Sequence, residues 1–459
     1  MIALTSLKAP LSVNFEMTQV CNLQCRFCFS NSATHQHKNP PIERLMKIVD
    51  ALAEAQVFQL SFFGGEFTTI PHWEDIVSHA SHKGFFLGFV SNGTRLTRAS
   101  VKCLAAHGIT NGAVSLHGPE AIHDQIVGVP GAFRKAIAGI RECCEEGISI
   151  NILFTPTKSN FTSLYETARW LKENDVPVVE IVVSRLCPSG EALSLWDELH
   201  LTLNDYKYLF QVMQTIRSDF AIPANMGDAF PLCVVPYKYW NLIAGCWQST
   251  GYGFISSTGE VRACTILPGS YGNILETPLT EIWSERLREV RRLEHLPLRC
   301  KLCPFFCGGG CSASRKGATH CAADEYIPQP QDEKVLTFAL WIPKLMYLMS
   351  RRALDRHKVS GGSADGERPL PPMTAKPQFN CRYGLRKDMN GYIGFFGGRG
   401  VLTFDDQAAH IVQLLDGQNS IFDVVRAVEG SLSHNSDHAR ESTLDLLRSL
   451  NRANLLTFH

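Results

Sequence analysis

The sequence of 459 residues has no net charge, since its 44 lysine and arginine residues balance 44 aspartate and glutamate residues. A protein with this balance has no overall field that would attract nucleic acid or an anionic membrane surface. Long apolar runs are missing as well. The longest one, at 335–349, contains Pro343 and Lys344 and is too short to cross a bilayer. We therefore expect no nucleic-acid partner, no membrane span, and a packed or interfacial helix at 335–349.

We also expect no signal peptide, because the N-terminal segment has neither a basic stretch nor a long apolar core. Sixteen cysteines would suit a disulfide framework in a short secreted chain. Without a signal sequence, they indicate reduced, metal-binding thiols in the cytoplasm. With 45% apolar and 19% charged residues, the chain is ordinary globular material that can form two or three packed domains.

Segments typical of strands and helices alternate from residue 11 to about residue 185. The helical segments, such as 42–55 and 133–146, place apolar residues at three- and four-residue spacing. Six strands with helical connections between them predict a parallel sheet and an α/β fold. The strands are expected at 12–16, 59–63, 86–91, 112–116, 148–154 and 178–183.

Three cysteines follow the first predicted strand at Cys-x3-Cys-x2-Cys spacing, namely Cys21, Cys25 and Cys28. Three thiolates on one loop can hold three irons of a [4Fe-4S] cluster and leave the fourth iron open to a substrate or cofactor. The alternatives are a zinc knuckle or three unrelated thiols, because cysteine motifs alone are ambiguous.

This spacing, with Phe27 before the last cysteine, resembles the radical S-adenosylmethionine (SAM) enzymes. The resemblance covers most of the chain and implies a partial (β/α)6 barrel of the TIM type, with the site at the carboxyl ends of the strands. It also implies that SAM binds the open iron. One electron from the cluster then cleaves SAM to methionine and a 5'-deoxyadenosyl radical that abstracts hydrogen from the substrate. Catalysis would depend on the three cysteines and on a reducing partner such as flavodoxin or ferredoxin.

A glycine-rich motif after the second predicted strand resembles a SAM-binding loop of this family. Gly64 and Gly65 would allow close approach of the backbone, and Glu66 would hold the amino group of SAM. Phe67 stands where the family usually has proline, which leaves the shape of this loop open. A simple turn is the alternative.

Polar residues at the ends of later strands match other SAM contacts of the family. Ser91 and Asn92 match the ribose and carboxylate contacts, although an Asn-Gly turn is the alternative, and Ser115 resembles a further contact. Arg185 could pair with the SAM carboxylate, and a surface ion pair is its rival. His117 replaces the aspartate most common in the SPASM subgroup. We assign it no base role, because histidines at strand ends are often structural.

A second group of seven cysteines resembles the SPASM extension, which binds up to two auxiliary [4Fe-4S] clusters in enzymes that modify peptides and proteins. By their order, the resemblance gives the first auxiliary cluster Cys246, Cys264 and Cys311, and the second one Cys300, Cys303, Cys307 and Cys321. Only three residues separate Cys303 from Cys307, where five are usual. Structural zinc is the alternative for the whole group.

The first auxiliary cluster lacks a fourth assigned cysteine, because none lies shortly before Cys246. Cys233, a vacant iron that binds substrate, and a non-cysteine ligand are the three possibilities for that position. The remaining cysteines are expected to be small buried apolar residues: Cys103, Cys143, Cys144, Cys187 and Cys381.

A stretch rich in glycine, serine and proline separates the cysteine-rich region from the C-terminal residues. About 80 residues follow it, with three short strand-like runs and three helical segments. They resemble the small peptide chaperone of pyrroloquinoline quinone biosynthesis, a recognition element that binds the leaders of ribosomally made, modified peptides. Such elements take the leader as an added strand. A winged-helix-like DNA binder is the alternative, but the last helix has no basic stripe.

These observations predict four regions: a radical SAM barrel at 1–220, a SPASM domain at 221–331, an apolar helix and linker at 332–375, and a small α+β, winged-helix-like domain at 376–459. The predicted function is a maturase that binds a precursor peptide by its leader and modifies its core by crosslinking, excision or epimerisation. One alternative is action on a folded protein or small molecule, as in sulfatase-maturing or haem-pathway enzymes. The other is a zinc-stabilised peptide-binding adaptor.

Overall fold

The computed structural model of this protein forms two compact units, Met1–Val335 and Leu336–His459. The apolar helix predicted at 335–349 and the part of the predicted linker before residue 370 lie outside the described residues. The structure describes residues 7–32, 37–245, 249–288, 290, 296, 300, 307, 309–314, 324–327, 370–388, 391–396, 400–431 and 436–459.

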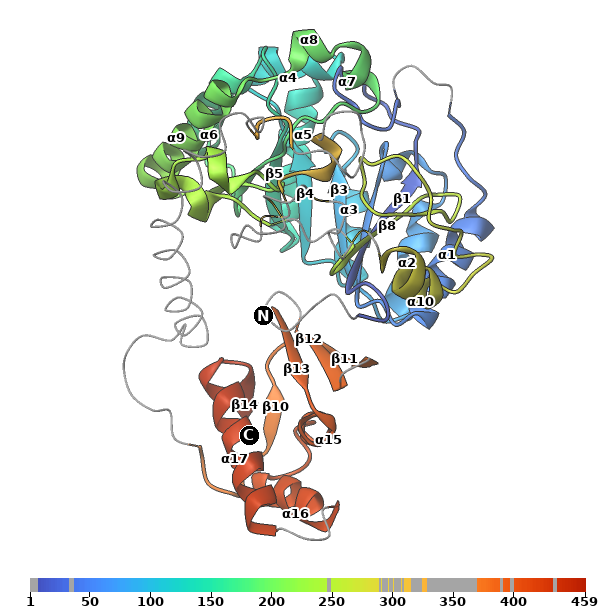
Figure 1. Cartoon of the computed structure of the whole chain (residues 1–459), viewed down its shortest axis with the longest axis vertical. Coiled ribbons are helices and arrows are strands. Elements are labelled where there is room, and N and C mark those ends of the chain that lie inside the picture. The colour runs from blue at the N-terminus through green and yellow to red at the C-terminus, as the bar shows by residue number, and fades with distance from the viewer. Residues whose placement is uncertain are drawn as a thin grey trace. The chain divides into compact units, whose positions relative to one another are not determined.

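The first unit contains a nine-stranded sheet whose central six strands are parallel, which confirms the predicted α/β fold. Figure 1 shows these strands at the centre of the unit and α1, α2, α6 and α9 at its periphery. The six strands are β1 (Ser12–Thr18), β2 (Gln59–Gly64), β3 (Phe86–Ser91), β4 (Asn111–Ser115), β5 (Ser149–Phe154) and β6 (Ile181–Val183). The helices are α1 (Ile42–Glu54), α2 (Trp73–His82), α3 (Arg98–Ala106), α4 (Glu120–Val127), α5 (Ala132–Glu145), α6 (Leu164–Glu173), α7 (Glu191–Ser194), α8 (Trp196–Leu199), α9 (Leu203–Phe220) and α10 (Leu279–Glu281).

Three short strands that the sequence pattern did not predict extend this sheet at its two ends. β7 (Ala224–Met226) runs parallel to β6, and β8 (Tyr252–Ile255) runs parallel to β1. β9 (Val261–Arg262) pairs with β8 in the antiparallel sense. The order is β7-β6-β5-β4-β3-β2-β1-β8-β9, so the sheet continues from the barrel into the cysteine-rich region.

Alternation along the strands separates the apolar core from the functional face. On β1, Val13 and Phe15 are fully buried, whereas Asn14 between them lines a cavity. Successive side chains of a strand point to opposite faces, so one face of β1 packs and the other faces the cavity. α1 covers the sheet with an apolar stripe that includes Leu45, Ile48 and Leu52.

The described residues of the second unit form a three-stranded antiparallel sheet, a two-stranded pair and three helices. Its predicted strands and helices are confirmed, and the pair formed by the first and last strands was not predicted. The elements are β10 (Pro377–Phe379), β11 (Tyr383–Asp388), β12 (Gly391–Phe396), β13 (Gly400–Phe404), α15 (Asp406–Gln413), α16 (Ile421–Ser431), α17 (Ser436–Arg452) and β14 (Leu456–Phe458). A core that includes Phe396, Val424 and Leu447 holds them together. In neither unit do the described helices include one with the length and hydropathy of a membrane span.

Candidate active site

The three cysteines of the first motif line a cavity of about 340 Å³ at the carboxyl ends of the parallel strands. Most of the predicted site residues line the same cavity: Cys21, Cys25, Phe27, Cys28, Gly64, Gly65, Ser91, Asn92, Ser115, His117 and Arg185. They follow different strands, yet meet because parallel strands end at one edge of the sheet. Glu66 is the one predicted contact of this group that does not line the cavity.

The surroundings of the three thiols fit a cluster with one iron facing the cavity. Burial raises the pKa of Cys21 to about 11 and that of Cys25 well above its usual value, so these thiols are protonated until iron displaces the protons. The amide of Leu23 donates to Cys21 Sγ at 3.4 Å, and Asn92 Nδ2 lies 3.8 Å from the same sulfur. Hydrogen bonds to ligand sulfurs are typical of iron–sulfur sites. Among the described residues, no three His, Cys, Asp or Glu side chains are grouped around the position of a single metal ion.

Gly64, the last residue of β2, and Gly65 let the following loop pack against the segment that leads into Cys21. Gly64 has a φ of +149°, and a Cβ atom there would lie 2.3 Å from the carbonyl oxygen of Thr18. A Cβ atom on Gly65 would lie 2.3 Å from the carbonyl oxygen of Val20. The amides of Gly65 and Glu66 donate to these same two carbonyls at 2.7 and 2.8 Å. The glycines therefore position the cysteine loop.

The carboxylate of Glu66 lies behind the cavity wall and joins the loop after β2 to the end of β3. It is fully buried and accepts from Thr68 Oγ1 at 2.7 Å, from Ser91 Oγ at 3.0 Å and from the Asn92 amide at 2.8 Å. Burial raises the pKa of Glu66, and these hydrogen bonds oppose the rise. Glu66 thus holds the two residues that line the cavity, and a direct contact with SAM stays a prediction.

Glu66→Gln is expected to lower the free energy of unfolding by about 1–3 kcal/mol, because the amide cannot accept from all of the donors that face the carboxylate. Stability to urea should fall even without SAM, and SAM binding should weaken as Ser91 and Asn92 shift. A variant with normal stability but weaker SAM binding would instead indicate direct contact. Both can be measured on anaerobically reconstituted protein.

Phe67 belongs to the hydrophobic core. Its ring is fully buried and packs edge-on against Trp73, with the centroids 5.4 Å apart. It begins a 3-10 turn, η2 (Phe67–Thr69), in which Glu66 accepts from the Thr68 amide. The loop therefore closes without the proline that the family usually has at this position.

Two stacked histidines stand beside the cysteine loop and are neutral. His117 Nδ1 accepts from the Thr155 amide at 3.2 Å, and the His117 amide donates to His123 Nδ1 at 3.1 Å. Burial lowers the pKa of His117 well below its usual value and that of His123 to about 4. The rings of Phe27 and His117 pack in a T-shaped arrangement, with their centroids 4.7 Å apart. His117 is thus held by backbone contacts, in line with assigning it no base role.

Acid is expected to destabilise the barrel through His123. Because its folded pKa of about 4 lies below the usual value of 6.5, its contribution to stability is present above pH 6.5 and is lost as the pH falls toward 4. Between pH 7.5 and 5.5 the loss should be about 1.3 kcal/mol. In urea unfolding of the cluster-free protein, His123→Asn should remove this contribution and leave that of His117, whereas the exposed His82→Asn should remove neither. Equal pH dependence in wild type and His123→Asn would contradict the expectation.

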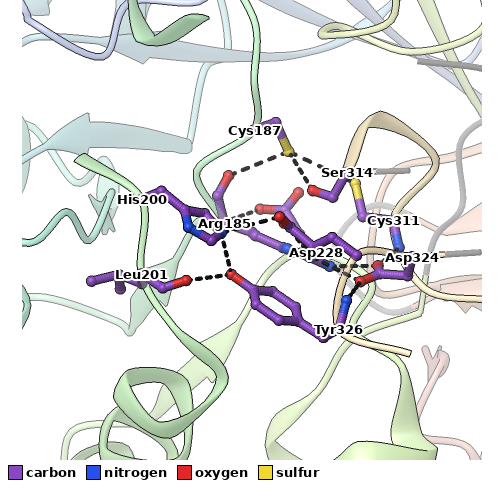
Figure 2. A network of polar contacts seen from close by, with 10 residues as sticks. Arg185, Cys187, His200, Leu201, Asp228, Cys311, Ser314, Asp324 and Tyr326 are labelled. Carbon is purple, nitrogen blue, oxygen red and sulfur yellow. Dashed lines mark hydrogen bonds and ion pairs between the residues drawn. The ribbon is translucent and has the colours of Figure 1, made fainter. Parts of the chain in front are cut away.

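Arg185 forms a buried ion pair with the cysteine-rich region (Figure 2). Its guanidinium donates to both oxygens of Asp324 at 2.6 and 2.9 Å and to Glu325 at 3.0 Å. It also lies between the rings of Phe230 and Tyr326, 4.8 and 4.7 Å from their centroids. Burial opposes its charge, but Asp324 outweighs this and raises the pKa of Arg185. The alternative of an ion pair at the surface is wrong, because Arg185 does form an ion pair but its side chain is fully buried.

Asp324 connects this ion pair to the loop that carries Cys311. One of its oxygens accepts from the Cys311 amide at 2.9 Å. Gly310 has a φ of +82°, and a Cβ atom there would lie 2.3 Å from the same oxygen. Gly310 therefore allows Asp324 to approach the backbone, and through Asp324 the guanidinium of Arg185 fixes the position of Cys311.

The second cysteine group is described in part. Cys246, Cys303 and Cys321 lie outside the described residues. Cys300 lies next to the glycine loop, since a Cβ atom on Gly309 would be 3.5 Å from its sulfur. The possible ligand Cys233 lies in a 3-10 turn, η4 (Leu232–Val234), and does not line the cavity.

Sequence reasoning missed the position of Cys187. This residue is buried, as expected of a small apolar residue, but it packs together with Cys264 and Cys311, two predicted cluster ligands. The available signal was its place two residues after Arg185, just beyond the end of β6.

The comparisons with known proteins agree with this geometry. Residues 15–171 match the Radical SAM superfamily, and residues 246–304 match the SPASM iron-sulfur cluster-binding domain. The chain is 29% identical to the AdoMet-dependent heme synthase of Methanosarcina barkeri over 341 residues, which cover 70% of this chain and 95% of that protein. It is 27% identical to the mycofactocin maturase MftC of Mycolicibacterium smegmatis over 321 residues, covering 67% and 80% of the two chains.

Solved structures show the same fold. SuiB of Streptococcus suis bound to S-adenosylmethionine superposes with a TM-score of 0.57 at 17% identity, covering 71% of this chain and 78% of that one. The enzyme anSMEcpe with bound AdoMet gives a TM-score of 0.56 at 20% identity, covering 74% and 100%. The matches to the Radical SAM superfamily and to its named synthases and maturases contradict the hypothesis of a non-enzymatic adaptor. The chain contains a radical SAM domain and a SPASM domain and is an enzyme, and its cofactors are [4Fe-4S] clusters and SAM.

Proposed function

We propose that this enzyme modifies a ribosomally synthesised precursor peptide, which its C-terminal unit binds by the leader. The mycofactocin maturase among its relatives and the structure of SuiB bound to the precursor peptide SuiA support a peptide substrate. The observation that carries the proposal is an exposed apolar strand at the edge of the C-terminal sheet.

That strand is β13, which lies at one end of the sheet order β11-β12-β13. Val401 and Leu402 are adjacent on it and are 38% and 37% exposed. Proteins usually protect the edges of their sheets with charge, proline or a covering segment. An exposed apolar edge suits a peptide that adds one more strand, because backbone hydrogen bonds give affinity and apolar side chains give specificity.

The barrel residues have distinct tasks in this proposal. Cys21, Cys25 and Cys28 would hold the cluster that binds SAM, and the bound pair supplies the one-electron chemistry that abstracts hydrogen from the substrate. Gly64 and Gly65 shape the wall beside them. Apolar side chains in the lining would limit the access of water to bound SAM: Leu23, Phe27, Phe63, Val90, Val127, Leu153 and Leu186. A flavodoxin or ferredoxin would supply the electron in the cytoplasm.

Co-expression tests this function. Each short reading frame that flanks the gene is co-expressed anaerobically with the enzyme. The masses of the peptides are then measured by mass spectrometry. One peptide should change mass with the wild type and not with Cys21→Ala/Cys25→Ala/Cys28→Ala. Leu402→Asp should reduce the conversion but not peptide-independent SAM cleavage. The control is Val179→Asp, at an apolar residue of the barrel unit that is 51% exposed. SAM cleavage with every peptide unmodified would contradict the proposal.

The relation to heme synthases supports a second candidate, a haem-pathway reaction on a small molecule. This match covers 70% of the chain. In that case, deletion of the C-terminal unit should leave turnover of an iron porphyrin intact. A peptide maturase should lose peptide modification on the same deletion and retain SAM cleavage.

A further inference from the structure

We propose that Cys187 is a protein ligand of the auxiliary [4Fe-4S] cluster to which the sequence assigns Cys264 and Cys311. The resemblance to SPASM proteins gives that cluster three cysteines, Cys246, Cys264 and Cys311, and Cys187 would be the fourth. This inference rests on the SPASM cofactor and holds whether the substrate is a peptide or a small molecule. Cys187 comes from the barrel, just after β6, rather than from the cysteine-rich region itself.

The first support is the position of the sulfur. Cys187 Sγ lies 3.9 Å from Cys311 Sγ and 3.2 Å from Ser314 Oγ. Figure 2 shows its side chain directed toward Cys311. Cys187 also belongs to the buried cluster against which Cys264 packs. Cysteines from three segments far apart in the sequence therefore pack in one cluster, with two of their sulfurs in contact, which a cysteine serving only as a small apolar residue does not require.

The second support is the rigid attachment of both cysteine segments. Arg185, two residues before Cys187, donates to Asp324, and Asp324 accepts from the amide of Cys311. The Arg185 amide in turn donates to Asp228 at 2.6 Å. The buried ion pair between Arg185 and Asp324 thus connects the backbone segment of Cys187 to that of Cys311. A preformed iron–sulfur site needs ligands held at fixed positions, and hydrogen-bonded residues outside the ligand set commonly hold them there.

The third support concerns Cys264, which already has the surroundings of a ligand. The amide of Ile266 donates to Cys264 Sγ at 3.4 Å. The amide two residues after Cys21 makes the same contact with the sulfur of that residue, also at 3.4 Å. The segment after Cys264 therefore repeats the amide-to-sulfur hydrogen bond found in the loop of Cys21.

The position of Cys187 also has a functional consequence. Cys187 lines the cavity, whereas Cys264 and Cys311 do not. As a ligand, it would stand between the substrate and the auxiliary cluster and close the coordination of the iron that faces the cavity. With that position filled by a cysteine, the cluster would have no open iron there to bind the substrate. On binding, a bond forms between iron and sulfur and the thiol releases its proton, with no change in electron count.

The experiment uses the full-length chain with Cys21→Ala/Cys25→Ala/Cys28→Ala as the parent, so that the remaining iron is auxiliary. Cys187→Ala and Cys187→Ser are added to it, with Cys143→Ala as the control at a fully buried cysteine of α5. After anaerobic reconstitution, iron and sulfide are counted. Electron paramagnetic resonance spectra of the reduced clusters are recorded with and without cyanide, a ligand for an open iron. Gel filtration and circular dichroism establish folding.

We expect the parent and Cys143→Ala to have spectra that cyanide does not change. Cys187→Ala should either lose about four irons per chain or retain them with a spectrum that cyanide shifts. Cys187→Ser should retain iron with an altered spectrum, because oxygen replaces sulfur as the ligand. Unchanged iron and spectra in both variants would overturn the proposal. A parent that already responds to cyanide, or a Cys187–Cys311 disulfide in the loaded parent, would overturn it as well.

Discussion

Arg185→Met is expected to lower the free energy of unfolding by about 3–5 kcal/mol, because it leaves Asp324 as an unpaired charge in the protein interior. The side chains of Arg185 and Asp324 are both completely buried, so solvent does not screen the pair. The loop of Cys311 depends on Asp324 and should lose its position at the same time. We therefore expect reduced auxiliary iron together with reduced stability, measured by iron analysis and urea unfolding of the anaerobic protein.

Two further variants separate the loss of a charge pair from the loss of one side chain. Arg185→Met/Asp324→Asn should be less destabilised than the sum of the two single variants, because the double variant leaves neither member of the Arg185–Asp324 pair as an uncompensated buried charge. Arg169→Met removes an exposed ion pair with Glu166 and should cost less than about 1 kcal/mol. Simple additivity in the double variant would show that the buried pair contributes no coupling.

The sequence predicted the barrel well because its signals are local and repeated. Strands such as β3 and β5 are six residues long and strongly apolar, and amphipathic helices separate them. β7 and β9 have three and two residues, which is too short for any periodic pattern. They form because neighbouring strands present free edges, and that is a property of the folded sheet.

The site divides in the same way. Residues at the ends of parallel strands could be expected to meet, and Ser91, Asn92 and Ser115 do line one cavity with the cysteines. Contacts across long sequence separations could not be expected. Arg185 pairs with a carboxylate 139 residues later, and Cys187 meets Cys311 124 residues later. Neither pairing has a local pattern, since each depends on how the cysteine-rich region folds back on the barrel.

Gly65→Ala is expected to abolish SAM cleavage. The added Cβ atom would lie 2.3 Å from the carbonyl oxygen of Val20, and the obstacle is backbone, which cannot rotate away. The loop must move, and the segment that leads into Cys21 must move with it. Misplacement of a reacting group by about 1 Å commonly costs about 100-fold in rate. We expect at least that loss in 5'-deoxyadenosine formation, together with the loss of about four irons per chain.

The matched control for this variant is Gly251→Ala. A Cβ atom there would meet only Leu11 Cδ1, at an ordinary contact distance of 3.7 Å, so activity and iron content should stay at the wild-type level. The auxiliary clusters are a second control, because they lie outside the displaced loop and should keep their iron in Gly65→Ala. Full iron content and normal SAM cleavage in Gly65→Ala would show that the cysteine loop does not depend on its packing against the glycines. Loss of iron from all clusters would instead indicate a general folding defect.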